Sequence, residues 1–144
     1  MNKQETVRLL RECNAGIKMG ISSLNDTIPH IKNTKFADAL VEGRREHEKL
    51  ESETQALLQK YHDPDKGPSP FVKAMAKMKT DMRFFLKEQD TVAADLMTDG
   101  CHMGIKSLSR YLNQYPNAEE GVRDLTGRLI AVEEKMVRDI RPYL

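Results

Sequence analysis

The sequence predicts an all-α protein, a single domain built as a bundle of four long helices. Apolar residues recur three and four positions apart through most of the 144 residues, which is the spacing of one face of an α-helix. Nothing reads as a strand, because alternating apolar and polar residues and runs of β-branched residues are both absent. A nine-residue stretch also occurs twice, and a repeat of this kind indicates a helical unit that needs its copy to bury its apolar face.

The repeated stretch is GIKMGISSL at residues 16–24 and GCHMGIKSL at residues 100–108, with six of nine positions identical. Upstream of each copy lies a second echo, QETV at 4–7 and QDTV at 89–92. A glycine inside a helix costs about 1 kcal/mol relative to alanine, so we expect the repeated glycines to allow close packing of the first and third long helices. They are Gly16, Gly20, Gly100 and Gly104.

The first hairpin of helices is predicted at residues 3–61. Its first helix ends at Pro29, and Thr34 can cap the second helix. Each helix carries one inward stripe, and a polar residue interrupts it: Asn14 in the first helix and His47 in the second.

A crossover of residues 62–88 joins the two hairpins. After a turn-forming cluster, Ser69 caps a short extra helix with Pro70 at its first position. A connection of this length can run along the bundle and place the third long helix parallel to the second, as the long crossover of ferritin-like folds does. The short helix is basic on one side, and its other side carries Phe71, Met75, Met78, Met82 and Phe85. That stripe either packs on the bundle or offers an adaptable face for a peptide, a membrane surface or a neighbouring subunit.

The second hairpin is predicted at residues 89–141. The apolar side of its first helix begins with Val92 and Leu96, and Pro116 closes this helix. Asn117 and Glu120 have the spacing of a capping box for the last helix. The apolar stripe of that helix is Val122, Leu125, Leu129, Val132, Met136 and Ile140.

Charge and composition narrow the classes of partner. The 23 Lys and Arg nearly balance the 22 Asp and Glu, so no overall field attracts nucleic acid. No apolar run approaches the roughly 18 residues of a membrane span. Cys13 and Cys101 lie in helical patterns without a signal segment, which predicts a reduced, cytoplasmic protein. The two thiols are expected to be buried small hydrophobes, with a redox pair as the alternative.

The chain resembles a bacterial family of uncharacterised ferritin-like four-helix-bundle proteins made of two related hairpins. In that family a Cys/Asp-x-x-Gly pattern lies early in each repeat, and the matching positions here are Cys13 to Gly16 and Met97 to Gly100. The resemblance implies the fold and supplies no established reaction.

A degenerate di-metal site is the candidate for chemistry. Ferritin-like di-metal proteins place Glu on two helices and Glu-x-x-His on the other two. Here Arg44 replaces the Glu before His47, and Met136 replaces the His after Glu133. Asp99 and His102 have a spacing that could chelate a metal. The candidate metal ligands, for Fe or Mn, are His47, Asp99, His102 and Glu133.

Intact apolar stripes combined with broken ligand motifs favour a non-catalytic bundle without a cofactor. We expect a structural, stress-associated or interaction protein that assembles with itself or with a protein partner. The alternatives are a divergent di-metal protein with oxidase-like or storage activity, and a binding module that uses the methionine-rich crossover helix. Catalysis by a nucleophile has no support, because no Gly-x-Ser-x-Gly and no phosphate-binding glycine loop is present.

Overall fold

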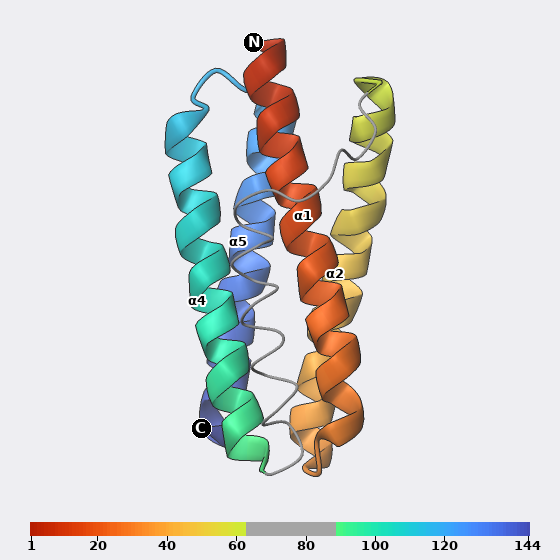
Figure 1. The fold of residues 1–144 in the computed structure, drawn as a ribbon, viewed down its shortest axis with the longest axis vertical. Coiled ribbons are helices and arrows are strands. Elements are labelled where there is room, and N and C mark those ends of the chain that lie inside the picture. Colours follow the sequence, from red (N-terminus) through yellow and green to blue (C-terminus); the bar gives the residue numbers. More distant parts are fainter. Residues whose placement is uncertain (63–88) are drawn as a thin grey trace.

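The computed structural model describes residues 1–62 and 89–144, and within these ranges it contains four long α-helices and no strand. The prediction of an all-α four-helix protein is confirmed (Figure 1). The predicted short helix of the crossover and its methionine-rich stripe lie outside the described residues. The long helices are α1 (Lys3–Thr27), α2 (Thr34–Lys60), α4 (Asp90–Gln114) and α5 (Glu120–Ile140).

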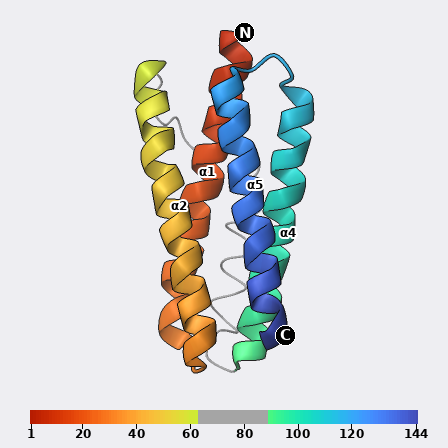
Figure 2. The ribbon, with the colours of Figure 1, turned by 180° about the vertical axis from the view of Figure 1, so that it is seen from behind.

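The helices form two antiparallel hairpins packed side by side (Figures 1 and 2). α1 packs against α2, α4 and α5, and α5 also packs against α2. In Figure 1, α2 and α4 run in the same direction, so the third long helix is parallel to the second. No helix of ranges 1–62 and 89–144 is both long enough and apolar enough to cross a bilayer.

Two clusters of buried side chains fill the bundle. The first lies around α1 and α5 and contains Leu9, Leu10, Cys13, Ile17, Leu125 and Leu129. The second lies toward the opposite end and contains Leu24, Phe36, Leu40, Met97, Cys101 and Ile140. Burial of each large aliphatic side chain contributes about 1.5–3 kcal/mol, so these two clusters supply the main driving force for folding.

Asparagine side chains cap the first helix of the bundle and the second. The side-chain oxygen of Asn2 accepts a hydrogen bond from the backbone N–H of Glu5 at 3.0 Å. The side-chain oxygen of Asn33 accepts one from the backbone N–H of Phe36, also at 3.0 Å. Asn33 is therefore the cap of α2, and Thr34 is its first helical residue. These bonds satisfy backbone donors that have no partner inside a helix.

The second hairpin uses a different device. The N-cap of α5 is Glu119 and carries no side-chain cap, so the predicted capping box of Asn117 and Glu120 is not formed. The backbone of Asn117 instead bonds to the start of α1: its carbonyl accepts from the amide of Asn2 at 2.6 Å, and its amide donates to Glu5 at 2.7 Å. The contact with the other hairpin prevails over the local cap.

The echo upstream of the repeat has a matching role in both hairpins. Glu5, in the first turn of α1, accepts an amide of the α4–α5 loop. Asp90, in the first turn of α4, accepts the amides of Lys32 and Asn33 in the α1–α2 loop, at 2.9 and 2.8 Å. Each hairpin thus contributes a carboxylate that accepts backbone hydrogen bonds from the loop of the other hairpin.

Candidate functional site

The buried polar centre of the bundle is the imidazole of His47, which is 1% exposed. His47 lies on the inward stripe of α2, between Gly43 and Leu50. Its Nδ1 lies 2.7 Å from the carbonyl oxygen of Gly43, and its Nε2 lies 2.6 Å from Oε1 of Glu133 on α5. The predicted core histidine therefore joins α2 to α5, and both ring nitrogens have a partner.

The partners determine where the protons are. A carbonyl oxygen only accepts, so Nδ1 of His47 carries a hydrogen and donates it to Gly43. Between Nε2 and Oε1 of Glu133 there must then be one more proton, held either by an imidazolium facing a carboxylate or by a carboxylic acid facing a neutral imidazole. Helices α2 and α5 thus share a proton in the core.

Two opposing effects act on the pKa of His47. Burial alone lowers it, because the charged ring is removed from water. The hydrogen bond and the charge of Glu133 raise it, helped by the Gly43 carbonyl and by the charge of Glu46, and the net result is a pKa above the ordinary value. The bundle therefore favours the protonated pair.

One of the repeated glycines, Gly20, leaves the space that the imidazole of this pair occupies. A Cβ atom on Gly20 of α1 would lie 2.8 Å from Nε2 of His47. A Cβ atom on Gly104 of α4 would contact the Glu133 carboxylate at an ordinary 3.8 Å. At Gly20 the absence of a side chain thus makes room for His47 of the second helix, while Gly104 lies beside Glu133 without such a requirement.

Cys101 lies beside the carboxylate of the pair. Burial, followed by the charge of Glu133 and a hydrogen bond with it, raises the pKa of the Cys101 thiol well above its ordinary value. The thiol is therefore neutral and acts as a donor to Glu133. The sequence did not connect these two residues, although Cys101 lies three positions before Gly104 on the same face of its helix.

The second cysteine belongs to the other core cluster. The hydroxyl of Thr126 donates to the carbonyl of Val122 at 2.8 Å. The Cys13 thiol, 3.1 Å from Thr126 Oγ1, therefore donates to that oxygen. Burial raises the pKa of Cys13 to about 12. Both cysteines are buried and reduced, in different clusters, as expected for small core residues and not for a redox pair.

The four candidate metal ligands do not converge. His47 and Glu133 meet in the core, but Asp99 and His102 are exposed on α4. The inward positions of this part of α4 are Met97, Cys101, Gly104 and Leu108, and a helix that buries these residues turns 99 and 102 toward solvent. Within residues 1–62 and 89–144, no group of three or more His, Cys, Asp or Glu side chains could hold a metal ion.

Asn14, the polar residue in the stripe of α1, is buried at a different place. Its side-chain oxygen accepts from the Gln55 amide nitrogen at 2.8 Å, so it joins α1 to α2. Asn14 and His47 thus serve separate helix pairs and do not form one site.

Comparisons with protein-family models, with curated proteins and with solved structures found no match to this chain. What the protein does must therefore be argued from its own residues.

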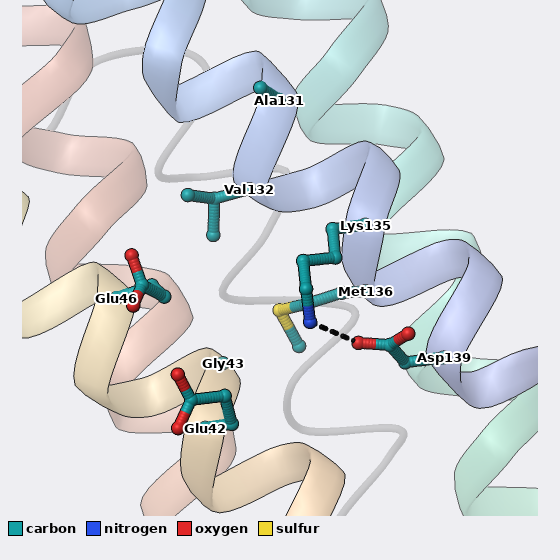
Figure 3. A pocket seen from close by; sticks show the side chains of 8 residues that line it. All are labelled: Glu42, Gly43, Glu46, Ala131, Val132, Lys135, Met136 and Asp139. Atoms are coloured by element: carbon teal, nitrogen blue, oxygen red, sulfur yellow. Dashed lines mark hydrogen bonds and ion pairs between the residues drawn. The ribbon is translucent and has the colours of Figure 1, made fainter.

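A surface groove lies between α2 and α5 (Figure 3). It has a volume of about 340 Å³. Gly43, whose carbonyl holds His47, is part of its wall. Sequence reasoning missed this groove, although a glycine facing a flexible Met across a helix pair is the available signal. The lining residues are Glu42, Gly43, Glu46, Ala131, Val132, Lys135, Met136 and Asp139.

Proposed function

We propose that the protein is a non-catalytic helical bundle of the ferritin-like type that acts as an interaction scaffold, binding a protein partner or another copy of itself. The observation that carries the proposal is the closed hydrogen bonding of His47: Gly43 occupies one ring nitrogen and Glu133 the other. A histidine that binds a metal, or that exchanges protons with a substrate, needs a nitrogen available for that contact.

The surroundings of the pair support a structural role. Gly20 leaves no space between α1 and the imidazole, since even a methyl group there would lie 2.8 Å from Nε2. On the side of α4, the Cys101 thiol is hydrogen-bonded to the Glu133 carboxylate. A buried pair whose partners come from the bundle itself specifies which helices meet, and in what register. The interior then holds the shape, and binding takes place on the surface.

Metal analysis of the purified protein tests the proposal against the di-metal alternative. The protein is produced in medium supplemented with Fe and Mn, and its metal content is measured by plasma mass spectrometry. We expect far less than one metal per chain and a melting temperature that a chelator does not change. About two metals per chain, lost in a His47→Ala, Glu133→Ala double variant, would establish the alternative. Asp99→Ala with His102→Ala is the matched control for exposed ligands.

Sedimentation velocity over a wide range of concentration tests self-association. A stable oligomer would identify the partner as another copy of the chain. A monomer would leave a different protein as the partner, and the surface that it meets can be argued from the groove between α2 and α5.

A further inference from the structure

We infer that the groove between α2 and α5 binds a segment of a partner protein that presents an arginine or lysine next to an apolar side chain. The inference rests on the proposed interaction role and deepens it by giving the chemical class of the partner. Three features carry it: the shape of the groove, its apolar floor and the sign of the charges on its rim.

Gly43 of α2, which has no side chain, forms part of the groove wall. Met136 of α5 fills the space below, with its sulfur 2.9 Å from where a Cβ atom on Gly43 would lie. Above this contact the wall is formed by short or half-buried apolar side chains, Ala131 and Val132 (Figure 3). At about 340 Å³ the hollow has the size of a small ligand site and can hold one or two side chains.

The rim of the groove is acidic. Glu42 and Glu46 stand one turn apart on α2, and Lys135 and Asp139 stand one turn apart on α5 (Figure 3). Among the described residues that line the groove, three carry a carboxylate and one carries an ammonium group. The protein as a whole carries a formal charge of +1, so the negative sign is a property of this place.

Lys135, the cation among the described rim residues, is already engaged. Lys135 Nζ lies 2.6 Å from the Asp139 carboxylate. The hydrogen bond with Asp139 raises the pKa of Lys135, and the charges of Glu42 and Glu46 raise it further, so the field of the rim favours added positive charge. Among residues 1–62 and 89–144, the two glutamates pair along their own helix, Glu42 with Arg45 and Glu46 with Lys49.

The α2 ion pairs are easily exchanged. Arg45 and Lys49 are 60% and 66% exposed. Exposed pairs of this kind contribute about 0–1 kcal/mol, so a cation from a partner can replace them at small cost. An arginine or lysine combines the required parts, because its hydrocarbon stem can lie on Met136 and Val132 while its head meets Glu42 and Glu46. An apolar neighbour on the same segment would cover the rest of the floor.

Binding of designed peptides to the full-length protein tests the inference. The probe is a synthetic peptide in which arginine and leucine recur at helical spacing. One matched peptide carries glutamate in place of arginine, and another carries serine in place of leucine. Affinity is measured by calorimetry, and the site is located by the methyl signals of Met136 and Val132 in ¹³C NMR spectra. We expect the arginine–leucine peptide to bind best and to shift these two signals.

Charge variants separate the groove from the rest of the surface. The double variant Glu42→Gln with Glu46→Gln is expected to weaken peptide binding by about tenfold or more, since it removes the charge of both rim carboxylates on α2. Glu48→Gln with Glu134→Gln is the matched control: it removes the same charge from exposed positions of the same two helices outside the groove, and should leave affinity within about twofold.

Several results would overturn the inference. The first is that the arginine–leucine peptide does not bind. The second is that the glutamate peptide, the arginine–serine peptide or the polyamine spermine binds as tightly as the arginine–leucine peptide. The third is that both double variants weaken peptide binding equally. Dissociation of a homodimer by Glu42→Gln with Glu46→Gln would make the occupant a second copy of the chain, which also contradicts the inference. None of these results bears on metal content, so failure here is distinguishable from failure of the proposed non-catalytic role.

Discussion

Nε2 of His47 lies 2.6 Å from Oε1 of Glu133, and this contact couples helices from the two hairpins through one buried proton. The imidazole is 1% exposed, while the Glu133 side chain is 13% exposed. The pair is therefore closed toward the core and close to water on one side only. Its behaviour can be predicted from the charges, the space around it and the acidity of its neighbours.

Removing one member of the pair should destabilise the bundle. His47→Ala leaves a largely buried carboxylate without its partner and is expected to lower the free energy of unfolding by about 2–4 kcal/mol. Replacing both residues, as His47→Leu with Glu133→Leu, should restore stability to within about 1 kcal/mol of the natural protein. Denaturant unfolding monitored by circular dichroism measures both. The surface variant Lys135→Ala should cost less than about 1 kcal/mol. A small effect of His47→Ala would mean that the pair contributes little.

Stability should depend on pH through His47. Folding raises the pKa of His47 above the value of about 6.5 that it has in the unfolded chain. The native state then binds its proton more tightly, so the stabilisation is complete below about pH 6.5 and is lost as pH rises through the folded pKa. The free energy of unfolding should fall as pH rises above about 6.5.

Glu133→Gln provides the control for this pH dependence, because the amide retains the shape and removes the charge. The decline should disappear or reverse in that variant. Glu46, the other carboxylate that acts on His47, is replaced in a second control, Glu46→Gln, which should preserve most of the decline. The thiols of Cys13 and Cys101 also have raised pKa values, so pH above about 8.5 is avoided. An unchanged slope in Glu133→Gln would assign the effect to another group.

Alanine at the two equivalent glycines should have opposite effects. Gly20→Ala places a methyl group 2.8 Å from an imidazole that is fixed at both nitrogens, and should cost about 1–3 kcal/mol. Gly104→Ala meets its neighbour at 3.8 Å and should stabilise by about 0.5–1 kcal/mol through helix propensity. In a His47→Ala background, Gly20→Ala should become stabilising. Equal effects at both glycines would show that His47 does not determine the need for Gly20.

The thiols should react only when the protein unfolds. Cys13 and Cys101 are buried, and their pKa values are raised, so the reactive thiolate is suppressed in the native state. Labelling with an aromatic disulfide should be slow in buffer and should accelerate with denaturant along the unfolding curve. Cys13→Ala and Cys101→Ala variants assign each rate. Fast native-state labelling of Cys101 would instead indicate that α4 and α5 separate locally.

The ends of the first and third long helices were predictable, because a proline follows each of them. Pro29 and Pro116 end the patterns, and the duplication indicates two hairpins. Which residues of a helix face the core was harder to predict. The apolar side of the third long helix was expected to begin at Val92 and Leu96, whereas Ala93, Ala94 and Met97 are the buried residues. One residue corresponds to about 100° of rotation.

That change of phase decided the outcome for the candidate site. It turned Asp99 outward and brought Cys101 toward Glu133. His47 was placed correctly in the core, because its stripe on α2 is unambiguous from Phe36 to Leu50. Glu133 was placed in the same candidate site as His47, but as a second metal ligand and not as its hydrogen-bond partner, since the exact approach of two helices depends on loops and crossing angles that a single sequence does not encode locally.

Two carboxylates connect the hairpins reciprocally. Glu5 of α1 accepts a hydrogen bond from the α4–α5 loop, and Asp90 of α4 accepts two from the α1–α2 loop. The amides of Lys32 and Asn33 in one turn, and of Asn117 in the other, find their acceptor in the opposite hairpin, so a hairpin that formed alone would leave these donors to water. Docking of the halves and completion of their turns are therefore one event. The two halves, which share the repeated stretch at residues 16–24 and 100–108, are thus held together at both ends of the bundle by backbone donors of one hairpin and carboxylates of the other.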